Sequence, residues 1–98
     1  MSLCDTIIEK TKHLEQRGSL YTIYNESDFE IKFVQDKISK SNQGVIRGFH
    51  GDCTTWKLIS CLHGKIKLVT YSVDTDTKNE YILCGDSKTN RSDLVPPR

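Results

Sequence analysis

Three residues in the middle of the chain carry side chains that can move a proton or stabilise negative charge. Histidine is the side chain that titrates nearest neutral pH, so His50 is a candidate base, and Arg47 and Lys57 are cations on either side of it. Removal of a proton beside a carbonyl needs a base and a cation for the enolate. Taken alone, His50 is better explained as a turn or strand-end histidine with a local hydrogen bond. For Lys57 the alternative to a site role is a solvated lysine, and for Arg47 it is a surface ion-pair partner.

Imidazole and thiolate groups occur close enough together to raise the question of zinc. His50 and Cys53 form one pair, and Cys61 and His63 form another. Their spacing matches no common zinc module, and we therefore expect no metal. The four cysteines of the chain are interpreted as reduced thiols, since its first residues show no export signal.

Composition excludes several classes of protein. Fourteen basic and thirteen acidic side chains leave a net charge of +1, which provides no general field for nucleic acid or an anionic membrane. No apolar run approaches membrane-spanning length, and the first ten residues lack the basic and apolar regions of a signal peptide. We expect a cytoplasmic protein with one small domain over residues 1–98.

The first half of the chain favours strands over helices. Residues 3–15 fit either a helix or a strand that begins near Ile7, because β-branched residues weaken the helix. Residues 20–24 are aromatic and β-branched, and residues 29–33 alternate apolar and charged side chains, so both segments are predicted as strands. Glycines bracket a further short strand at residues 44–50.

The second half contains the clearest local pattern. Residues 56–62 and 65–73 are predicted as an antiparallel hairpin around a tight turn at His63 and Gly64. A strand at residues 80–84 precedes a polar loop at 85–93, and Leu94 and Val95 resemble the start of a further element. Many short strands favour an all-β sandwich or barrel, with an open edge that needs cover from a partner chain.

Several motifs resemble one protein family. Residues 44–50, GVIRGFH, resemble the Gly-Val-x-Arg-Gly-x-His signature of the dTDP-4-dehydrorhamnose 3,5-epimerases and related dTDP-4-keto-sugar epimerases. The similarity extends upstream to residues 33–41, FVQDKISKS, and downstream to residues 57–58 and the turn at Gly64. Early and late elements, at residues 17–18 and at Asp74, follow the same order.

The resemblance implies a fold and an assembly. Members of this family have a cupin fold, an antiparallel jelly roll, and are usually homodimers in which early strands of one subunit complete the sheet and site of the other. Arg17 would then reach a partner's site near the nucleotide diphosphate, which suits a forked guanidinium. Thr22 falls where many members have Glu.

The resemblance also implies roles for individual residues. His50 would be the base, Lys57 would stabilise the enolate, and Arg47, Ser41 and Gln35 would bind a dTDP-sugar substrate. Proton transfer beside a ketone needs no redox cofactor. The resemblance implies that the site also needs the family's second half, with its tyrosine acid and orienting aspartate, whereas this sequence stops at Pro96-Pro97-Arg98. An inert sugar-nucleotide-binding or structural half-cupin is therefore the alternative to an active epimerase.

Overall fold

The computed structural model describes residues 4–48, 50–51 and 54–97. Within these residues the regular structure consists of seven strands and a single turn of 3-10 helix, η1. The bounds are β1 Thr6–Thr11, β2 His13–Glu15, β3 Gly18–Leu20, η1 Glu26–Asp28, β4 Lys57–Ser60, β5 Lys65–Ser72, β6 Thr77–Cys84 and β7 Thr89–Val95. The prediction of an all-β, cupin-like antiparallel fold is confirmed, and the helix considered for residues 3–15 was wrong for the residues described, because β1 and β2 occupy them.

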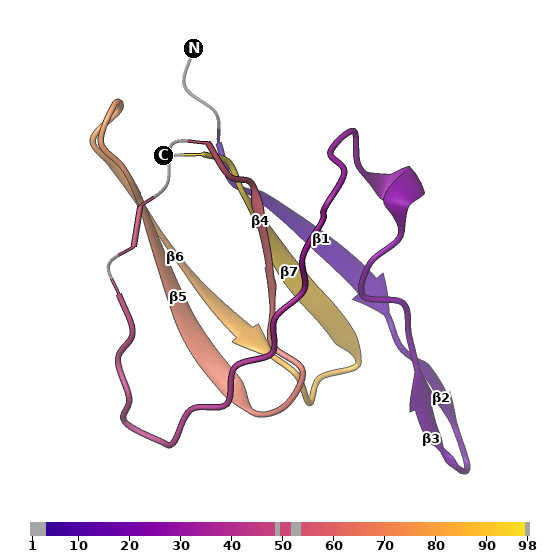
Figure 1. Cartoon of the computed structure of the whole chain (residues 1–98). Coiled ribbons are helices and arrows are strands. Elements are labelled where there is room, and N and C mark those ends of the chain that lie inside the picture. The colour runs from indigo at the N-terminus through magenta and orange to yellow at the C-terminus, as the bar shows by residue number, and fades with distance from the viewer. Residues whose placement is uncertain (1–3, 49, 52–53, 98) are drawn as a thin grey trace.

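Strand β7 is the centre of a three-stranded antiparallel sheet with the order β1-β7-β4 (Figure 1). Ile7 of β1 and Ile59 of β4 both lie opposite Asp93 of β7, so this carboxylate stands between two isoleucines. The interior of β7 is polar: Asn90, Ser92 and Asp93 are all buried. We predicted a polar loop over residues 85–93, and this was wrong from Thr89 onwards, where β7 begins. Polar side chains indicated a solvent-exposed loop, but in β7 several of them are buried.

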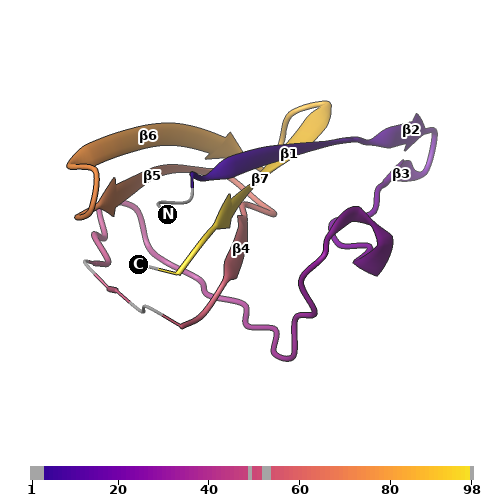
Figure 2. The same ribbon diagram turned by 90° about the horizontal axis from the view of Figure 1, so that it is seen from above.

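Strands β5 and β6 form a long antiparallel hairpin in which Lys65 pairs with Cys84 and Ser72 with Thr77. One face of this hairpin is the better buried, and it carries Thr70, Ser72 and the fully buried Leu83. Strand β6 lies next to β7, which places the hairpin beside the three-stranded sheet (Figures 1 and 2). The strand predicted at residues 80–84 is confirmed and begins earlier, at Thr77.

The link between β4 and β5 carries the chain from one sheet to the other. Two strands were correctly predicted on either side of His63 and Gly64, but their pairing as a hairpin was wrong, since β4 pairs with β7 and β5 with β6. Gly64 adopts a φ of 76°, and Cys61 donates its thiol to the carbonyl of His63 at 3.3 Å. These features turn the chain out of the first sheet instead of folding β5 back on β4.

The β6–β7 turn packs closely against this link. Gly85 donates its N–H to the carbonyl of Gly64 at 2.8 Å. A Cβ at position 85 would clash with the main chain of Leu62 and His63. The two sheets therefore meet at a corner that only glycine permits.

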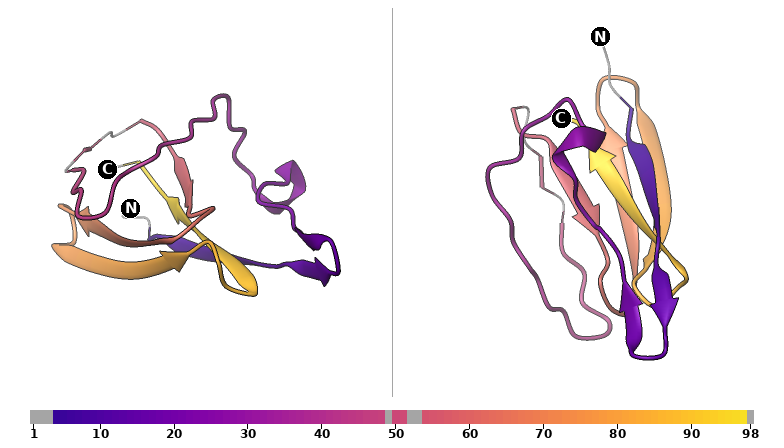
Figure 3. Two further views of the ribbon diagram at one scale, coloured as in Figure 1. Left: turned by 90° about the horizontal axis from the view of Figure 1, so that it is seen from below. Right: turned by 90° about the vertical axis from the view of Figure 1, so that its right-hand side faces the viewer.

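The β2–β3 hairpin projects from the rest of the molecule, and a long irregular segment runs from it back to β4 (Figure 3). Of the strand predicted at residues 20–24 only Leu20 is in a strand. Residues 29–33 form no strand, although Phe29, Ile31 and Phe33 are half-buried and the charged residues between them exposed, as the alternation predicted. The strand expected at 44–50 is absent from residues 44–48 and 50, and Phe49 lies outside the described residues.

Aromatic contacts replace sheet pairing in this irregular segment. The rings of Tyr24, Phe29 and Phe33 have centroids 5.7–5.8 Å apart, and Asn25 caps η1 by accepting from the N–H of Ser27. These ring contacts partly bury the aromatic side chains within the segment itself. The alternation of apolar and charged residues at 29–33 therefore occurs here without a neighbouring strand. In the part of the chain that the structure describes, no helix is long and apolar enough to cross a membrane.

Candidate functional site

Arg47 and Ser41 are the two predicted site residues that contact each other. The Nε–H of Arg47 donates to the hydroxyl of Ser41 at 2.8 Å, and a terminal N–H donates to the carbonyl of Lys40 at 3.3 Å. A tight turn brings them together, in which Val45 donates to the carbonyl of Asn42 at 3.2 Å. Gly44 has a φ of 86°, the conformation that the third residue of a type II turn requires.

Arg17 lies at the tip of the β2–β3 hairpin. Its guanidinium is 3.2 Å from the carboxylate of Glu15 and is 87% exposed. Gly18 follows with a φ of 136°, which lets the chain reverse at this point. The side chain can therefore meet an anion from solution, because its ion pair with Glu15 is solvated and weak.

Lys57 is the first residue of β4 and lies opposite Val95 of β7. Its side chain is exposed, as are those of His50 and Gln35, which both lie in the irregular segment before β4. Of the predicted site residues, the structure therefore anchors Lys57 on a strand and the Arg47–Ser41 pair on a turn. His50 and Gln35 have no regular element to hold them.

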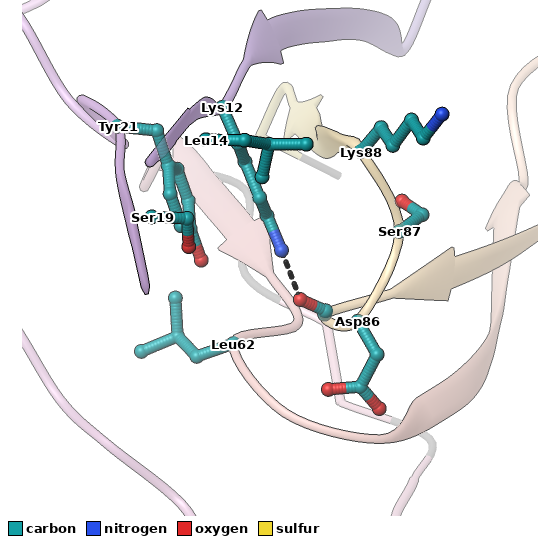
Figure 4. A pocket seen from close by; sticks show the side chains of 9 residues that line it. Lys12, Leu14, Ser19, Tyr21, Leu62, Asp86, Ser87 and Lys88 are labelled. Carbon is teal, nitrogen blue, oxygen red and sulfur yellow. Dashed lines mark hydrogen bonds between the residues drawn. The ribbon is translucent and has the colours of Figure 1, made fainter. Parts of the chain in front are cut away.

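Cavities formed by the described residues lie away from this segment. The first, of about 500 Å³, lies between the base of the β2–β3 hairpin and the β6–β7 turn (Figure 4). Its lining combines cationic, carboxylate, hydroxyl and apolar groups: Lys12, Leu14, Ser19, Tyr21, Leu62, Gly85, Asp86, Ser87 and Lys88. The second, of about 360 Å³, is bounded by β1, β7, Trp56 and the segment from Asp28 to Ile31. Neither cavity is lined by a predicted site residue.

Lys12 and Tyr21 of the first cavity were not singled out by the sequence. The ammonium of Lys12 lies 4.7 Å from the centre of the Tyr21 ring and donates to the carbonyl of Gly85 (Figure 4). The sequence offered only a weak sign of this contact. Lys12 comes just before, and Tyr21 just after, a short segment that contains a predicted turn. Neither position follows a motif.

Metal ligands do not gather in the described residues. Across 4–48, 50–51 and 54–97 no group of three or more His, Cys, Asp or Glu side chains could hold an ion. His63 is instead paired with Asp86, whose carboxylate is 3.3 Å from its Nδ1 and also accepts the N–H of Gly64 at 3.0 Å. Cys53, which completed the zinc hypothesis, lies outside the described residues.

The order of the motifs on this β-scaffold agrees with a direct comparison of sequences. The model of one family, dTDP-4-dehydrorhamnose 3,5-epimerase, matches residues 5–90. The chain belongs to this family. No solved structure matches the chain significantly.

Curated dTDP-4-dehydrorhamnose 3,5-epimerases from bacteria and an archaeon are similar to it. The protein from Salmonella typhimurium is 32% identical over 93% of this chain and 56% of its own length, and that from Methanothermobacter thermautotrophicus is 32% identical over 93% and 54%. The Escherichia coli protein is 36% identical over 61% of this chain and 37% of its own length. The chain thus spans about half the length, or less, of these curated relatives.

The epimerase family match includes every predicted site residue. Gln35, Ser41, Arg47, His50 and Lys57 fall inside residues 5–90, as does Arg17 at the hairpin tip. The two residues that contact the second cavity from β7 and the segment before β4, Leu94 and Trp56, are apolar and carry no proton chemistry. The residues with proton chemistry lie instead in the segment from Gln35 to Lys57.

Proposed function

We propose that this chain supplies part of a site that removes a proton beside the C4 ketone of a dTDP-4-keto-6-deoxysugar. The observation that carries the proposal is the family match over residues 5–90, which includes all six predicted site residues. Because the chain spans about half of its curated relatives, turnover by this chain is itself part of the proposal.

His50 acts as the base in this proposal. Its imidazole takes the proton from the carbon next to the carbonyl, and the electrons of that C–H bond move to the carbonyl oxygen to give an enolate. The ammonium of Lys57 stabilises the enolate oxygen. Return of a proton to the opposite face of the carbon gives the epimer, so no electrons are exchanged with a cofactor.

Substrate binding falls to the cationic and polar residues around this base. The hydrogen bond from Arg47 to Ser41 supports the assignment, because it holds a guanidinium in one direction while leaving further N–H groups for an anion or sugar hydroxyl. Gln35 contributes an amide that can donate and accept. Arg17 binds the diphosphate, and its exposed position at a projecting hairpin suits a site in a second copy of the chain.

The proposed assembly is therefore a homodimer in the cytoplasm. The β2–β3 hairpin supports it, because Leu14 and Leu20 are 62% and 73% exposed and would be covered by a second copy. Analytical ultracentrifugation measures the assembly directly. Mixing Arg17→Ala with His50→Ala chains tests the shared site, since one of the two sites in a mixed dimer would regain both residues.

Solvent deuterium incorporation into dTDP-4-keto-6-deoxyglucose, followed by NMR, tests the chemistry. Exchange by the wild-type chain is expected to fall by about 10²–10⁴-fold in His50→Ala, the usual contribution of a positioned base. His63→Ala is the matched control, because His63 is exposed, is paired with Asp86 and is not one of the predicted site residues. Exchange that survives in His50→Ala would overturn the role of His50.

A second outcome separates the epimerase from the inert alternative. If folded wild-type chain binds dTDP but exchanges no deuterium, the protein is a sugar-nucleotide-binding half-cupin. If it neither binds nor exchanges, the structural alternative holds. Lys57→Met should lower the exchange rate with little change in dTDP affinity, because Lys57 is assigned to the enolate and not to the nucleotide.

A further inference from the structure

The β2–β3 hairpin has no sheet partner of its own within the described residues. Its two strands pair only with each other, and all six strand residues are exposed. The hairpin projects from the body of the protein, which it meets at its base (Figures 1 and 3). Something at its base must fix that direction, since an isolated two-stranded hairpin is only marginally stable in water.

Lys12 is the residue at that base, between the end of β1 and the start of β2. Its main-chain N–H donates to the carbonyl of Lys88 at 3.0 Å, which continues the pairing of β1 with β7 by one step. Its ammonium donates to the carbonyl of Gly85 in the β6–β7 turn. The same ammonium lies 4.7 Å from the ring centre of Tyr21, the residue that follows β3.

These contacts join both strands of the hairpin to one fixed point. Lys12 precedes β2 and Tyr21 follows β3, so a clamp between them holds the two ends together over the β6–β7 turn (Figure 4). That turn is itself fixed, because Gly85 donates to Gly64 and packs against the main chain of Leu62. The direction of the hairpin is thereby tied to the corner where the two sheets meet.

We infer that Lys12 is a positioning residue for Arg17. The inference rests on the proposed function, in which Arg17 binds the diphosphate of a dTDP-sugar in a partner's site. Arg17 lies at the hairpin tip, so a small change of angle at the base becomes a larger displacement of its guanidinium. Lys12 touches no substrate; it acts through the hairpin.

Two pairs of variants separate the clamp from general effects of mutation. Lys12→Met removes the ammonium but keeps the length of the side chain, and Lys88→Met makes the same change in charge at a lysine of the same cavity. Tyr21→Leu removes the ring, whereas Tyr21→Phe keeps the ring and its attraction for the ammonium. Lys12→Arg restores a cation and donors, and it should rescue what Lys12→Met loses.

Hydrogen–deuterium exchange of the amides of residues 13–20 is the first readout, and it does not depend on activity. We expect exchange there to become on the order of tenfold faster in Lys12→Met and Tyr21→Leu, with β5 and β6 unchanged. Lys88→Met, Tyr21→Phe and Lys12→Arg should resemble wild type. Unchanged exchange in both Lys12→Met and Tyr21→Leu would overturn the clamp.

Affinity for dTDP is the second readout. Lys12→Met should weaken dTDP binding on the order of tenfold, and it should add little to the loss already caused by Arg17→Ala, because both act through the same guanidinium. Full additivity of the two changes would overturn the link from Lys12 to Arg17. If wild type binds no dTDP, the proposed function fails, while the exchange experiment still decides whether Lys12 fixes the hairpin.

Discussion

The Nε–H of Arg47 donates to the hydroxyl of Ser41 across 2.8 Å, so two residues of separate motifs are joined by one turn of the chain. The guanidinium has a fixed direction before any ligand arrives. Ligand affinity should therefore depend on Ser41 through Arg47, because ordering a free arginine side chain on binding costs conformational entropy.

Replacing Ser41 by Ala is predicted to weaken dTDP binding by about three- to tenfold, the loss of roughly one hydrogen bond. Isothermal titration calorimetry measures the affinity. Ser39→Ala is the control, since Ser39 lies on the same exposed segment and is not the partner of Arg47. Equal affinities for wild type and Ser41→Ala would show that the contact does not prepare Arg47 for a ligand.

Asn90→Ala is predicted to destabilise the fold by about 1–3 kcal/mol. Asn90 is fully buried in β7, and its side-chain amide donates to the carbonyl of Cys61 at 3.0 Å. The substitution leaves that carbonyl without its donor in the interior. Urea unfolding measures the loss, and Asn42→Ala, at an exposed position, should change stability by less than about 0.5 kcal/mol.

Gly85→Ala is predicted to be the more damaging of two glycine substitutions. The new methyl group would clash with the main chain of Leu62 and His63, which cannot move without separating the β6–β7 turn from the β4–β5 link. Gly44→Ala meets no atom within 4 Å and suffers only from its φ of 86°, at about 1–2 kcal/mol.

Thermal unfolding of the two glycine variants is the measurement. We expect Gly85→Ala to unfold at a clearly lower temperature than Gly44→Ala, or not to fold at all. The opposite order would mean that the corner between the sheets is looser than its contacts indicate.

Glu80 is predicted to titrate below its ordinary pKa of 4.5. The hydrogen bond from Lys78 lowers the pKa of Glu80 most, and the charges of Lys67 and Lys78 lower it further. Because the folded-state pKa is depressed, the stability from these pairs is present above the unfolded pKa and is lost as pH falls through the folded one. Carbon-detected NMR titration follows the carboxyl directly.

Lys78→Met should move the Glu80 titration back toward its ordinary range. Lys65→Met is the control, because Lys65 lies on the same hairpin but its ammonium is not paired with Glu80. A Glu80 titration that is the same in wild type and Lys78→Met would show that the pair is too solvated to matter.

Sequence patterns predicted the strands that are apolar and missed the strand that is polar. Residues 57–60 and 65–72 are rich in Leu, Ile and Val and were correctly predicted as strands, whereas β7, with Asn90, Ser92 and Asp93 in its interior, was interpreted mainly as a loop. Periodicity reports burial of apolar side chains and has no means of detecting a strand whose buried residues are polar. Pairing was missed because it depends on contacts between distant strands.

Site prediction depended on motif order and not on position in the fold. Arg47 and Ser41 are only six residues apart, and their contact depends on the turn that Gly44 makes possible. A contact of this kind depends on the local sequence alone. The clamp of Lys12 on Tyr21 and Gly85 joins residues from three separate parts of the chain. No spacing rule predicts such a contact, because it exists only once β1 and β7 have paired.

The central position of β7 also sets the order in which this protein can acquire its structure during synthesis. The β5–β6 hairpin can close as soon as Cys84 has emerged, since its partners are neighbours along the chain. Strands β1 and β4 must wait for β7, and Thr6 finds Leu94 only after nearly the whole described chain has been made. Until then the backbone N–H and C=O groups of β1 have no strand partner, so the chain is most open to pairing with other extended segments just before its polar central strand is made.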